Sequence, residues 1–464
     1  MYLSASRSRI SALALLTASA FAGGAWFGRS SSATTRDESP YSELAQLGRV
    51  MVMIENQYVV PVDHQKVVEG AIKGMVHELD PHSTYMTPDE FRIFQSDTEG
   101  RFGGIGIEVD LRDETITIIA PIEGSPADRA GILPGDRIIA IDGRGARGEP
   151  LEKLVRKLRG TPGSKVQISL RRSGRDTPLT IDLVREQIRV ASVVGARMDG
   201  DVLYLRLKQF QEGTHDELMQ VLGQLRRASG APWSGIVLDM RTNPGGLVDE
   251  ASEIADEFLQ RGTIYSTRHR GAVVDEVSAR SGGALVDGRM VVLVNQYSAS
   301  AAELVAGCLQ DNARATVIGN ATFGKGSVQS IVELPKGAGL KMTTMRYYTP
   351  KGRSIQAAGI SPDIVIEAPP GPRDPFEFIY ERDLEGHLPA EGPPPAKPLA
   401  VYRAPASSAP TSTASAPTSA PPGSRLPRTS ADVPRDPTRS SDYALNIAYQ
   451  TVLGRAPQPS APNK

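Results

Sequence analysis

Hydrophobic residues in the first part of the chain recur at three- and four-residue spacing, the pattern of helices with one apolar face. The two clearest stretches are "LAQLGRVMVMIENQYV" and "HQKVVEGAIKGMVHEL", which are separated by a turn at Pro61. Thr87 and Pro88 then stand where a further helix would begin. The pattern predicts an N-terminal helical module over residues 36–100.

The hydrophobic pattern changes to short β-type runs between residues 101 and 187. The runs "GIGIEVD", "TITIIAPI", "RIIAIDG" and "VQISLRR" are bounded by glycine, proline and aspartate, as strands commonly are. One stretch, "LEKLVRKLRG", keeps helical spacing. This segment is predicted to be a small β-rich domain with a helix.

Apolar runs and amphipathic stretches alternate over residues 188–374. Runs such as "VLYLRLKQF", "GIVLDM" and "RMVVLVN" are each followed by a helical pattern. This alternation predicts an α/β layered core whose chemistry lies at the carboxyl ends of the strands. The whole chain is therefore expected to be a multidomain α/β (α+β) protein.

Both ends of the chain depart from globular composition. Proline, alanine, serine and threonine dominate much of 375–440, which predicts a disordered spacer, and helical spacing returns over 441–455. Residues 1–35 contain Arg7 and Arg9 and then about 18 largely apolar residues, the layout of a secretory signal. Cleavage of this segment and its retention as a membrane anchor both stay open. We expect an exported protein, in the periplasm or on the extracytoplasmic face of the inner membrane.

The amino-acid composition reduces the number of function classes that the chain could belong to. Hydrophobic residues make up 40% of the chain and charged residues 23%, which suffices for sizeable cores. The 52 basic residues are balanced by 53 acidic ones, so no global charge favours nucleic acid as a partner. Cys308 is the only cysteine, so it forms no internal disulfide and is predicted to be buried. No ligand spacing predicts a metal site or a cofactor.

Small hydroxyl residues stand where a strand should pass into a helix, in "NQYSASAAEL" (295–304). Serine is a preferred N-cap, so capping is the ordinary interpretation of Ser298 and Ser300. The stretch "GNATFGKGSVQ" (319–329) changes the balance, because its Lys325 has three interpretations. Lys325 could be a solvated residue in a glycine turn, a P-loop lysine, or a catalytic base. The P-loop lacks support, because Gly326 replaces the required Ser or Thr and a strand follows instead of a helix.

A serine–lysine pair is the interpretation that joins the two stretches. A serine hydroxyl needs a base, and a lysine can serve if burial removes its proton. Ser300 would then be the nucleophile and Lys325 the base, with Gln329 placed four residues on to orient the amine. Backbone amides of Ala301 and of the glycines in "NPGG" would stabilise the oxyanion. Those glycines are Gly245 and Gly246, and which of them donates stays open.

Two resemblances agree with this chemistry. "FGGIGIEV" followed by "IEGSPADRAGILPGDRIIAIDG" resembles a PDZ domain, in which loop amides hold a terminal carboxylate and a strand edge accepts the peptide. The corresponding loop residues are Gly104, Ile105, Gly106 and Ile107. A glycine-rich hairpin without a ligand is the alternative. "DMRTNPGG", "NQYSASAAEL", "ATFGKGSVQ" and "MRYYTPKGRSIQAAGISPDI" resemble the carboxyl-terminal processing peptidases, also called tail-specific proteases.

The family resemblance covers roughly residues 41–368 and the closing helix. It implies Ser300 as nucleophile, Lys325 as general base, Gln329 as an assisting residue, and Ala301 with an "NPGG" glycine as the oxyanion hole. It also implies substrates with exposed apolar C-termini and self-association through the helical lead-in. An adaptor protein is a further candidate partner. Ala302, where a serine often follows, and the long insert before the last helix depart from the commoner pattern.

Rival functions find less support in the sequence. A Ser-His-Asp hydrolase lacks its G-x-S-x-G elbow around Ser298 and Ser300, and the six histidines are interpreted as surface or structural residues. Asp239 and Arg241 look catalytic, but a turn-stabilising pair at a strand end is the favoured role. A catalytically silent or partner-activated PDZ protein that only binds tails is the alternative from another class. The retained Ser300, Lys325 and Gln329 favour an exported serine endopeptidase instead.

Overall fold

The computed structural model describes residues 40–112, 115–122, 124–175, 177–230, 232–367, 378–392, 397–405 and 426–455. It divides the chain into two compact units, Met1–Gly74 and Met75–Lys464. Within the described residues no helix has the length and apolar character needed to cross a membrane. The leader predicted over 1–35 lies outside the described residues.

Two amphipathic helices begin the described chain, α2 (Pro40–Gln57) and α3 (His64–His77). Several apolar side chains of α2 are exposed, among them Leu44, Leu47 and Met53. The helical spacing of this region is therefore confirmed. Self-association through it stays a prediction.

A seven-stranded sheet forms the centre of the second unit. Its order is β10-β11-β12-β15-β16-β19-β20, with β10 antiparallel to β11 and all other neighbouring pairs parallel. The strands are β10 (Val193–Met198), β11 (Val202–Leu207), β12 (Gly235–Asp239), β15 (Arg289–Val294), β16 (Thr316–Gly319), β19 (Ile364–Glu367) and β20 (Ala400–Arg403). Every residue of β11 and β12 is buried, as expected of parallel strands covered on both faces.

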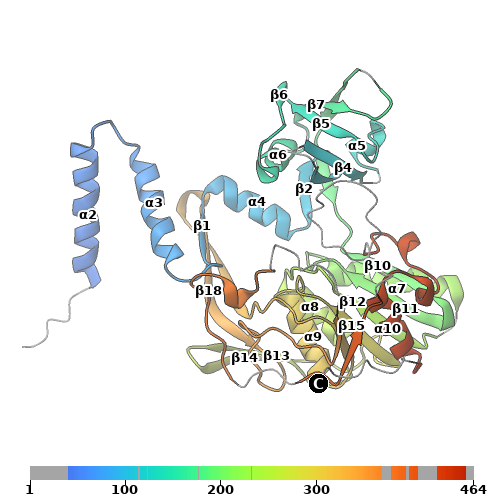
Figure 1. Cartoon of the computed structure of the whole chain (residues 1–464). Coiled ribbons are helices and arrows are strands. Elements are labelled where there is room, and N and C mark those ends of the chain that lie inside the picture. The colour runs from blue at the N-terminus through green and yellow to red at the C-terminus, as the bar shows by residue number, and fades with distance from the viewer. Residues whose placement is uncertain are drawn as a thin grey trace, which may run out of the picture. The chain divides into compact units, whose positions relative to one another are not determined.

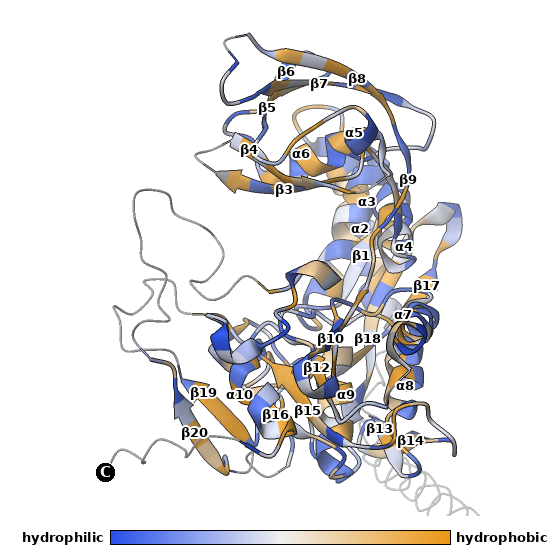
Figure 2. Ribbon diagram, turned by 90° about the vertical axis from the view of Figure 1, so that its right-hand side faces the viewer, coloured by the Kyte–Doolittle hydropathy of each residue, from blue (hydrophilic) through white to orange (hydrophobic). Residues whose placement is uncertain are grey.

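Helices cover both faces of this sheet, as Figures 1 and 2 show. One core joins the sheet to α7 (Thr214–Ser229), α8 (Val248–Asp256) and α9 (Ala301–Asp311), and it includes the buried Cys308. A second core joins the other face to α10 (Tyr443–Val452), the closing helix predicted from the sequence. The α/β core is therefore confirmed.

A second, largely antiparallel sheet contains β1 (Thr84–Met86), β13 (Thr263–His269), β14 (Ala272–Ser278), β17 (Ser327–Glu333) and β18 (Gly339–Tyr348). The helix α4 (Pro88–Thr98) belongs to the same unit, because Phe91 is buried against Gly339. The predicted helical module of 36–100 thus also contains a strand, β1, which pairs with β18 of this sheet. Apolar spacing found the helix α4, but only tertiary pairing shows that residues 84–98 belong with the core.

Residues 101–189 form the small β-rich domain. Its sheet runs β3-β4-β5-β7-β8, with β6 paired to β5, and encloses a core of its own. The elements are β3 (Ile107–Arg112), β4 (Thr115–Pro121), α5 (Pro126–Arg129), β5 (Arg137–Ile141), β6 (Arg144–Gly145), α6 (Leu151–Leu158), β7 (Lys165–Arg171) and β8 (Leu179–Val184). The entering strand β2 (Arg101–Gly104) pairs with the leaving strand β9 (Glu186–Arg189).

The predicted spacer over 375–440 is wrong for the parts that the structure describes. The strand β20 completes the central sheet from within it, and the short 3-10 helix η3 (Glu381–Asp383) contains the fully buried Glu381. Val433 packs in the core beneath α10. Composition concealed these parts, because a few apolar residues suffice to attach a Pro/Ser-rich segment to an existing core. Residues 368–377, 393–396 and 406–425 lie outside the described residues.

Candidate active site

The two halves of the predicted site follow neighbouring parallel strands. The "NPGG" turn comes after β12, Ser300 after β15, and Lys325 after β16, and these three strands are adjacent in the sheet. Carboxyl ends of parallel strands meet at one edge, where ligands and chemistry are usually found. Strand topology thus brings together segments that are far apart in the sequence.

The two serines of "SAS" have different environments. Ser298 is fully buried; its hydroxyl donates to the Met240 carbonyl (2.8 Å) and accepts from the Asn295 amide (3.0 Å). Ser300 occupies the N-cap of α9, yet its hydroxyl makes no capping hydrogen bond within the described residues. Ser300 and Glu303 form a capping box in which Glu303 accepts the Ser300 backbone amide, while the hydroxyl itself stays available for chemistry.

The backbone of Ser300 is strained, with φ 55° and ψ −117°. Residues with a β-carbon rarely adopt positive φ, and such strain costs roughly 1–3 kcal/mol. It resembles the sharp strand-to-helix turn that exposes a nucleophile in other hydrolases. The positive end of the α9 dipole lies at the same place.

The carboxylate of Glu303 holds this turn to the lysine segment. One oxygen accepts from the backbone amides of Ser300 (2.7 Å) and Lys325 (2.8 Å). The other accepts from the Thr322 hydroxyl (2.5 Å) and the Gly324 amide (2.7 Å). Glu303 is fully buried, which raises its pKa to about 7 against the opposing effect of these donors. Sequence reasoning missed Glu303, although its S-x-x-E spacing from Ser300 is a capping-box signal.

The environment of Lys325 favours the neutral amine. Burial lowers the pKa of Lys325, and the nearby Lys341 lowers it further. The carboxylates of Glu381, Glu303 and Asp80 oppose this shift without reversing it. Within the described chain, the ammonium group forms no ion pair. The direction of this shift is the one that a lysine acting as a base requires.

Carboxylates near Lys325 come from segments that sequence reasoning left aside. Asp80 accepts the amides of His82 and Ser83 and lies in the turn before β1. His82 contacts Glu381 at 2.7 Å, so it is part of a polar network instead of a surface residue. No sequence spacing linked Glu381 to Lys325, because Glu381 comes near only through the packing of η3, whose Glu381 amide donates to the Phe323 carbonyl (3.1 Å).

The glycines of "NPGG" lie against Ser300, and their amides differ. A β-carbon on Gly245 would lie 2.8 Å from Ser300 Cβ and 3.0 Å from the Ala301 nitrogen. The Gly245 amide is already used, because it donates to the Asn243 side chain (2.8 Å). Within the described residues the amides of Gly246 and Ala301 have no acceptor. Of the predicted oxyanion residues, Gly246 and Ala301 therefore have amides that are not already used, and their role as donors stays a prediction.

Asn243 is a second residue that sequence reasoning missed. Its side chain is fully buried and donates to the Leu207 carbonyl (2.9 Å), while its backbone carbonyl accepts from Ala299 (2.9 Å). This one residue thus connects the "NPGG" turn to β11 and to the segment that carries Ser300. A buried asparagine before a proline gave only a turn signal in the sequence.

The structure does not bring Gln329 into a hydrogen bond with Lys325. Its amide donates to the hydroxyls of Ser327 (2.8 Å) and Thr343 (3.3 Å). Lys325 precedes β17, and the pairing of β17 shifts register between Val328 and Gln329. The argument that residues four apart share a strand face does not hold across such an irregularity. A role for Gln329 stays a prediction.

Asp239 and Arg241 form a buried structural network. Arg241 contacts Asp239 (2.6 Å) and Asp442 (2.8 Å), and Tyr204 donates to Asp239 (2.9 Å). Asp442 is also the N-cap of α10, where it accepts from Leu445. The network attaches α10 to the end of β12, so the non-catalytic interpretation of this pair agrees with the structure.

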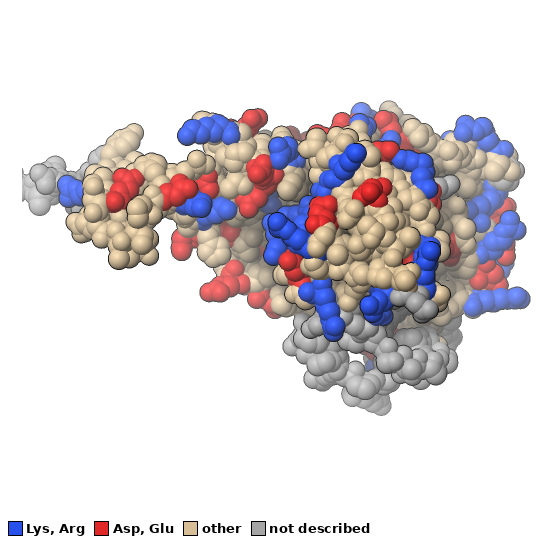
Figure 3. Space-filling view, turned by 90° about the horizontal axis from the view of Figure 1, so that it is seen from above, with Lys and Arg blue, Asp and Glu red and all other residues tan. Residues whose placement is uncertain are grey.

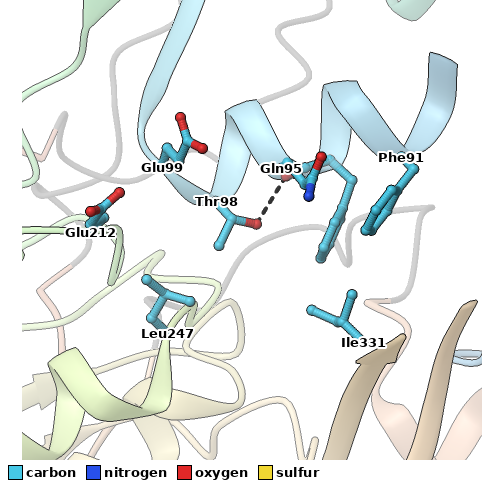
Figure 4. Close-up of a pocket in the computed structure, with 8 residues that line it drawn as sticks. Phe91, Gln95, Thr98, Glu99, Glu212, Leu247 and Ile331 are labelled. Carbon is cyan, nitrogen blue, oxygen red and sulfur yellow. Dashed lines mark hydrogen bonds between the residues drawn. The ribbon is translucent and has the colours of Figure 1, made fainter. Parts of the chain in front are cut away.

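A pocket of about 230 Å³ lies between α4 and the core (Figure 4). Figure 4 shows Phe91 directed from α4 toward Ile331, with Leu247 lining the same space and Glu99 and Glu212 near its rim. The rings of Phe91 and Phe94 are stacked, with centroids 6.5 Å apart. Leu247, which lines this pocket, directly follows Gly246 in the sequence.

The β-rich domain has the features expected for peptide capture. The strand β3 is an edge strand, paired only with β4 among the described residues. Gly106 adopts φ +75°, and its carbonyl accepts from the Ser125 hydroxyl (3.0 Å). The Gly104 backbone is instead used in pairing with β9. Peptide binding by Ile105, Gly106 and Ile107 stays a prediction.

Figure 3 shows no extended basic surface on the face that it displays, because Lys and Arg side chains are interspersed there with Asp and Glu. Among the described residues, no group of three His, Cys, Asp or Glu is arranged to hold a metal ion.

Three family models match the chain. The model "Peptidase family S41" matches residues 201–366, "PDZ domain" matches 117–172, and "Activating protease CtpB N-terminal domain" matches 14–90. Among solved structures, the photosystem II D1 C-terminal processing protease is 28% identical, with a TM-score of 0.44, covering 70% of this chain and 86% of that one.

Similar proteins cover most of the chain. A carboxy-terminal-processing protease of Bartonella bacilliformis is 39% identical over 438 residues, or 93% of this chain and 94% of its own length. The carboxy-terminal processing protease CtpA of Bacillus subtilis is 34% identical over 347 residues, or 74% of this chain and 72% of its own length. With its S41 core and its PDZ domain, the chain belongs to the carboxy-terminal-processing protease family of serine-type peptidases.

Proposed function

We propose that this peptidase is an exported endopeptidase that recognises exposed C-terminal tails and cleaves with Ser300 and Lys325. The observation that carries the proposal is the shared contact at Glu303. One carboxylate oxygen accepts the backbone amides of both residues, so the two segments meet at one point. The Ser300 hydroxyl is not used in capping, and burial lowers the pKa of Lys325.

The proposed reaction is a two-step acyl transfer. The Ser300 oxygen attacks the scissile carbonyl carbon while its proton passes to the neutral Lys325 amine. The tetrahedral intermediate collapses, the carbon–nitrogen bond breaks, and Lys325 returns the proton to the departing amine. Water then attacks the ester with Lys325 again as base, and this releases the acid and regenerates Ser300.

The oxyanion of the intermediate would be stabilised by the amides of Ala301 and Gly246. Both have no other acceptor within the described residues, and Ala301 also stands at the N-terminus of α9. Fixed amides of this kind are worth about 10²–10³-fold in rate in other hydrolases. Gly245 contributes differently, because its missing side chain lets the turn approach Ser300 and Ala301.

Substrate recognition would use two sites. The edge strand β3 and the loop before it would accept the C-terminal tail as an added strand. The pocket lined by Phe91, Leu247 and Ile331 would accept an apolar side chain of the bound peptide. Together they support a preference for apolar tails of partly unfolded proteins. Export is proposed from the signal-like composition of residues 1–35.

The proposal is tested by cleavage of an unstructured reporter with an apolar C-terminus. We expect residues 36–464 to cleave it, the Ser300→Ala and Lys325→Ala variants to be inactive, and a chelator to have no effect. Lys325→Arg keeps a positive charge but cannot act as a base at neutral pH, so it should also be inactive. Cleavage that persists in Ser300→Ala contradicts the assignment. Tail binding without cleavage by the wild type would instead favour a silent or partner-activated tail-binding protein.

A further inference from the structure

A fully buried carboxylate lies directly behind the proposed dyad and has no place in the reaction as written. Glu303 accepts four hydrogen bonds, two on each oxygen. A carboxylate with this many donors is held in one orientation. The donors come from the turn before α9 and from the segment after β16, so Glu303 joins two separate segments.

The two bonds to one oxygen have a particular geometric effect. Ser300 and Lys325 donate their backbone amides to the same atom, at 2.7 Å and 2.8 Å. Movement of either backbone away from the other must stretch or break one of these bonds. The same contact also holds the strained φ of Ser300, because it fixes the amide on which that torsion turns.

We infer that Glu303 is a positioning residue that sets the separation of the Ser300 nucleophile and the Lys325 base. This inference rests on the proposed dyad. Glu303 touches neither substrate nor reacting atoms, and it acts through the backbones of the two residues that do. Loss of sub-ångström placement in such a site can cost about 100-fold in rate.

The negative charge of Glu303 affects the pKa of Lys325, so its loss should change the pH–rate profile, which the loss of a purely structural residue would not do. The Glu303 carboxylate is one of the groups that raise the pKa of Lys325, together with Glu381 and Asp80 and against Lys341. His82 belongs to the same group of polar residues, because its ring contacts the Glu381 carboxylate. Replacing Glu303 by glutamine leaves the other groups in place and removes one negative charge. The Lys325 limb of the pH–rate profile should then move to lower pH.

The first variant is Glu303→Gln in the full chain, assayed for kcat and KM on the tailed reporter. We expect kcat to fall about 100-fold with KM nearly unchanged, and the acid limb to move to lower pH. The matched control is Glu217→Gln. Glu217 also accepts two backbone amides and a hydroxyl from a distant segment, at Ser192 and Val193. Its variant should lose stability and keep kcat.

A second variant keeps the inference testable if Glu303→Gln does not fold. Thr322→Val preserves shape and charge but removes the hydroxyl that lowers the pKa of Glu303. Protonation of Glu303 would then begin at higher pH and remove the same negative charge over more of the pH range, so the Lys325 limb should move to lower pH, in the same direction as in Glu303→Gln but by less. The inference would be overturned if the acid limb of the pH–rate profile stayed in place in both variants, or if Glu303→Gln kept the wild-type kcat.

Amide hydrogen exchange separates this inference from the proposed function. Exchange over 299–303 and 322–326 should become faster in Glu303→Gln and stay unchanged in Glu217→Gln. If Ser300→Ala still cleaves, the dyad is wrong, while faster exchange still shows that Glu303 holds the two segments together. If Ser300→Ala is inactive but exchange in Glu303→Gln is unchanged, the dyad stands and the positioning role is wrong.

Discussion

At the scale of single residues, Ser300 shows how a reactive group is made available at a cost in stability. Its φ of 55° is unfavourable for any residue with a β-carbon, and its hydroxyl does not offset this by capping α9. Ser298, two residues earlier, has both donor and acceptor satisfied. The contrast separates the structural serine from the proposed nucleophile.

The strain at Ser300 leads to a stability prediction. Glycine adopts positive φ freely, so Ser300→Gly should be more stable than Ser300→Ala by about 1 kcal/mol, although both lack the hydroxyl. Urea unfolding of the two variants measures the difference. Equal stability would mean that the surrounding turn does not hold residue 300 at positive φ in solution.

Glu303 leads to a prediction about stability and pH. Burial raises its pKa from 4.5 to about 7, so between these values the folded state binds more protons than the unfolded state. Stability contributed by this group is therefore present below about pH 4.5 and is lost as the pH rises through about 7. The loss is on the order of 3 kcal/mol.

The measurement compares urea unfolding of the wild type and Glu303→Gln at pH 5 and pH 8. The free energy of unfolding of the wild type, relative to the variant, should decrease at the higher pH. A constant difference would show that Glu303 titrates at an ordinary pKa, and a rising one would contradict the sign derived above.

At the scale of secondary-structure elements, the closing helix α10 contributes a charged partner as well as apolar packing. Its N-cap Asp442 shares Arg241 with Asp239 at the end of β12, the strand that leads into "NPGG". The helix is therefore attached to the strand end from which the "NPGG" turn begins.

Removing one carboxylate tests this attachment. Asp442→Ala should lower the free energy of unfolding by about 3–5 kcal/mol, because it leaves Arg241 buried with one partner and removes the cap of α10. Denaturant unfolding gives the value, and Asp436→Ala, which changes the half-buried N-cap of the preceding 3-10 helix, is the control. A cost below about 1 kcal/mol would show that the buried network is not important for stability.

At the scale of the whole molecule, the proposed recognition and the proposed cleavage belong to separate domains of one chain. The PDZ domain has its own core and sheet, while the proposed dyad lies on the α/β core. Recognition of a tail and hydrolysis of a peptide bond should therefore be separable by mutation.

Gly106→Ala is the variant for this separation. A β-carbon there would lie 2.2 Å from the Ser125 side chain at a φ of +75°, so the loop should distort while the peptidase core stays intact. We expect kcat/KM for a tailed reporter to fall about tenfold or more, and hydrolysis of a short peptide without the tail to be preserved. An equal loss on both substrates would indicate that the PDZ domain controls the catalytic step itself.

The sequence by itself determined the kinds of element, their order and the chemistry. Helical and alternating spacing are local properties of the chain, so the PDZ domain, the α/β core, Ser300 and Lys325 could be found from pattern and motif. The tertiary structure alone decided what depends on contact between distant segments. Strand order places β12, β15 and β16 side by side, and packing buries Glu303 behind both proposed dyad residues.

The errors and omissions have the same physical origin. Pairing with β18 made residues 84–86 a strand of the core, and pairing with β19 made residues 400–403 the seventh strand of the main sheet. A register shift in β17 lies between Val328 and Gln329, so the regular-strand argument for Gln329 does not apply and its role stays a prediction. The spacing of apolar residues reflects only interactions between neighbours along the chain. Hydrogen bonding between distant strands and the burial of charged groups depend on the whole fold, so only the tertiary structure could decide them.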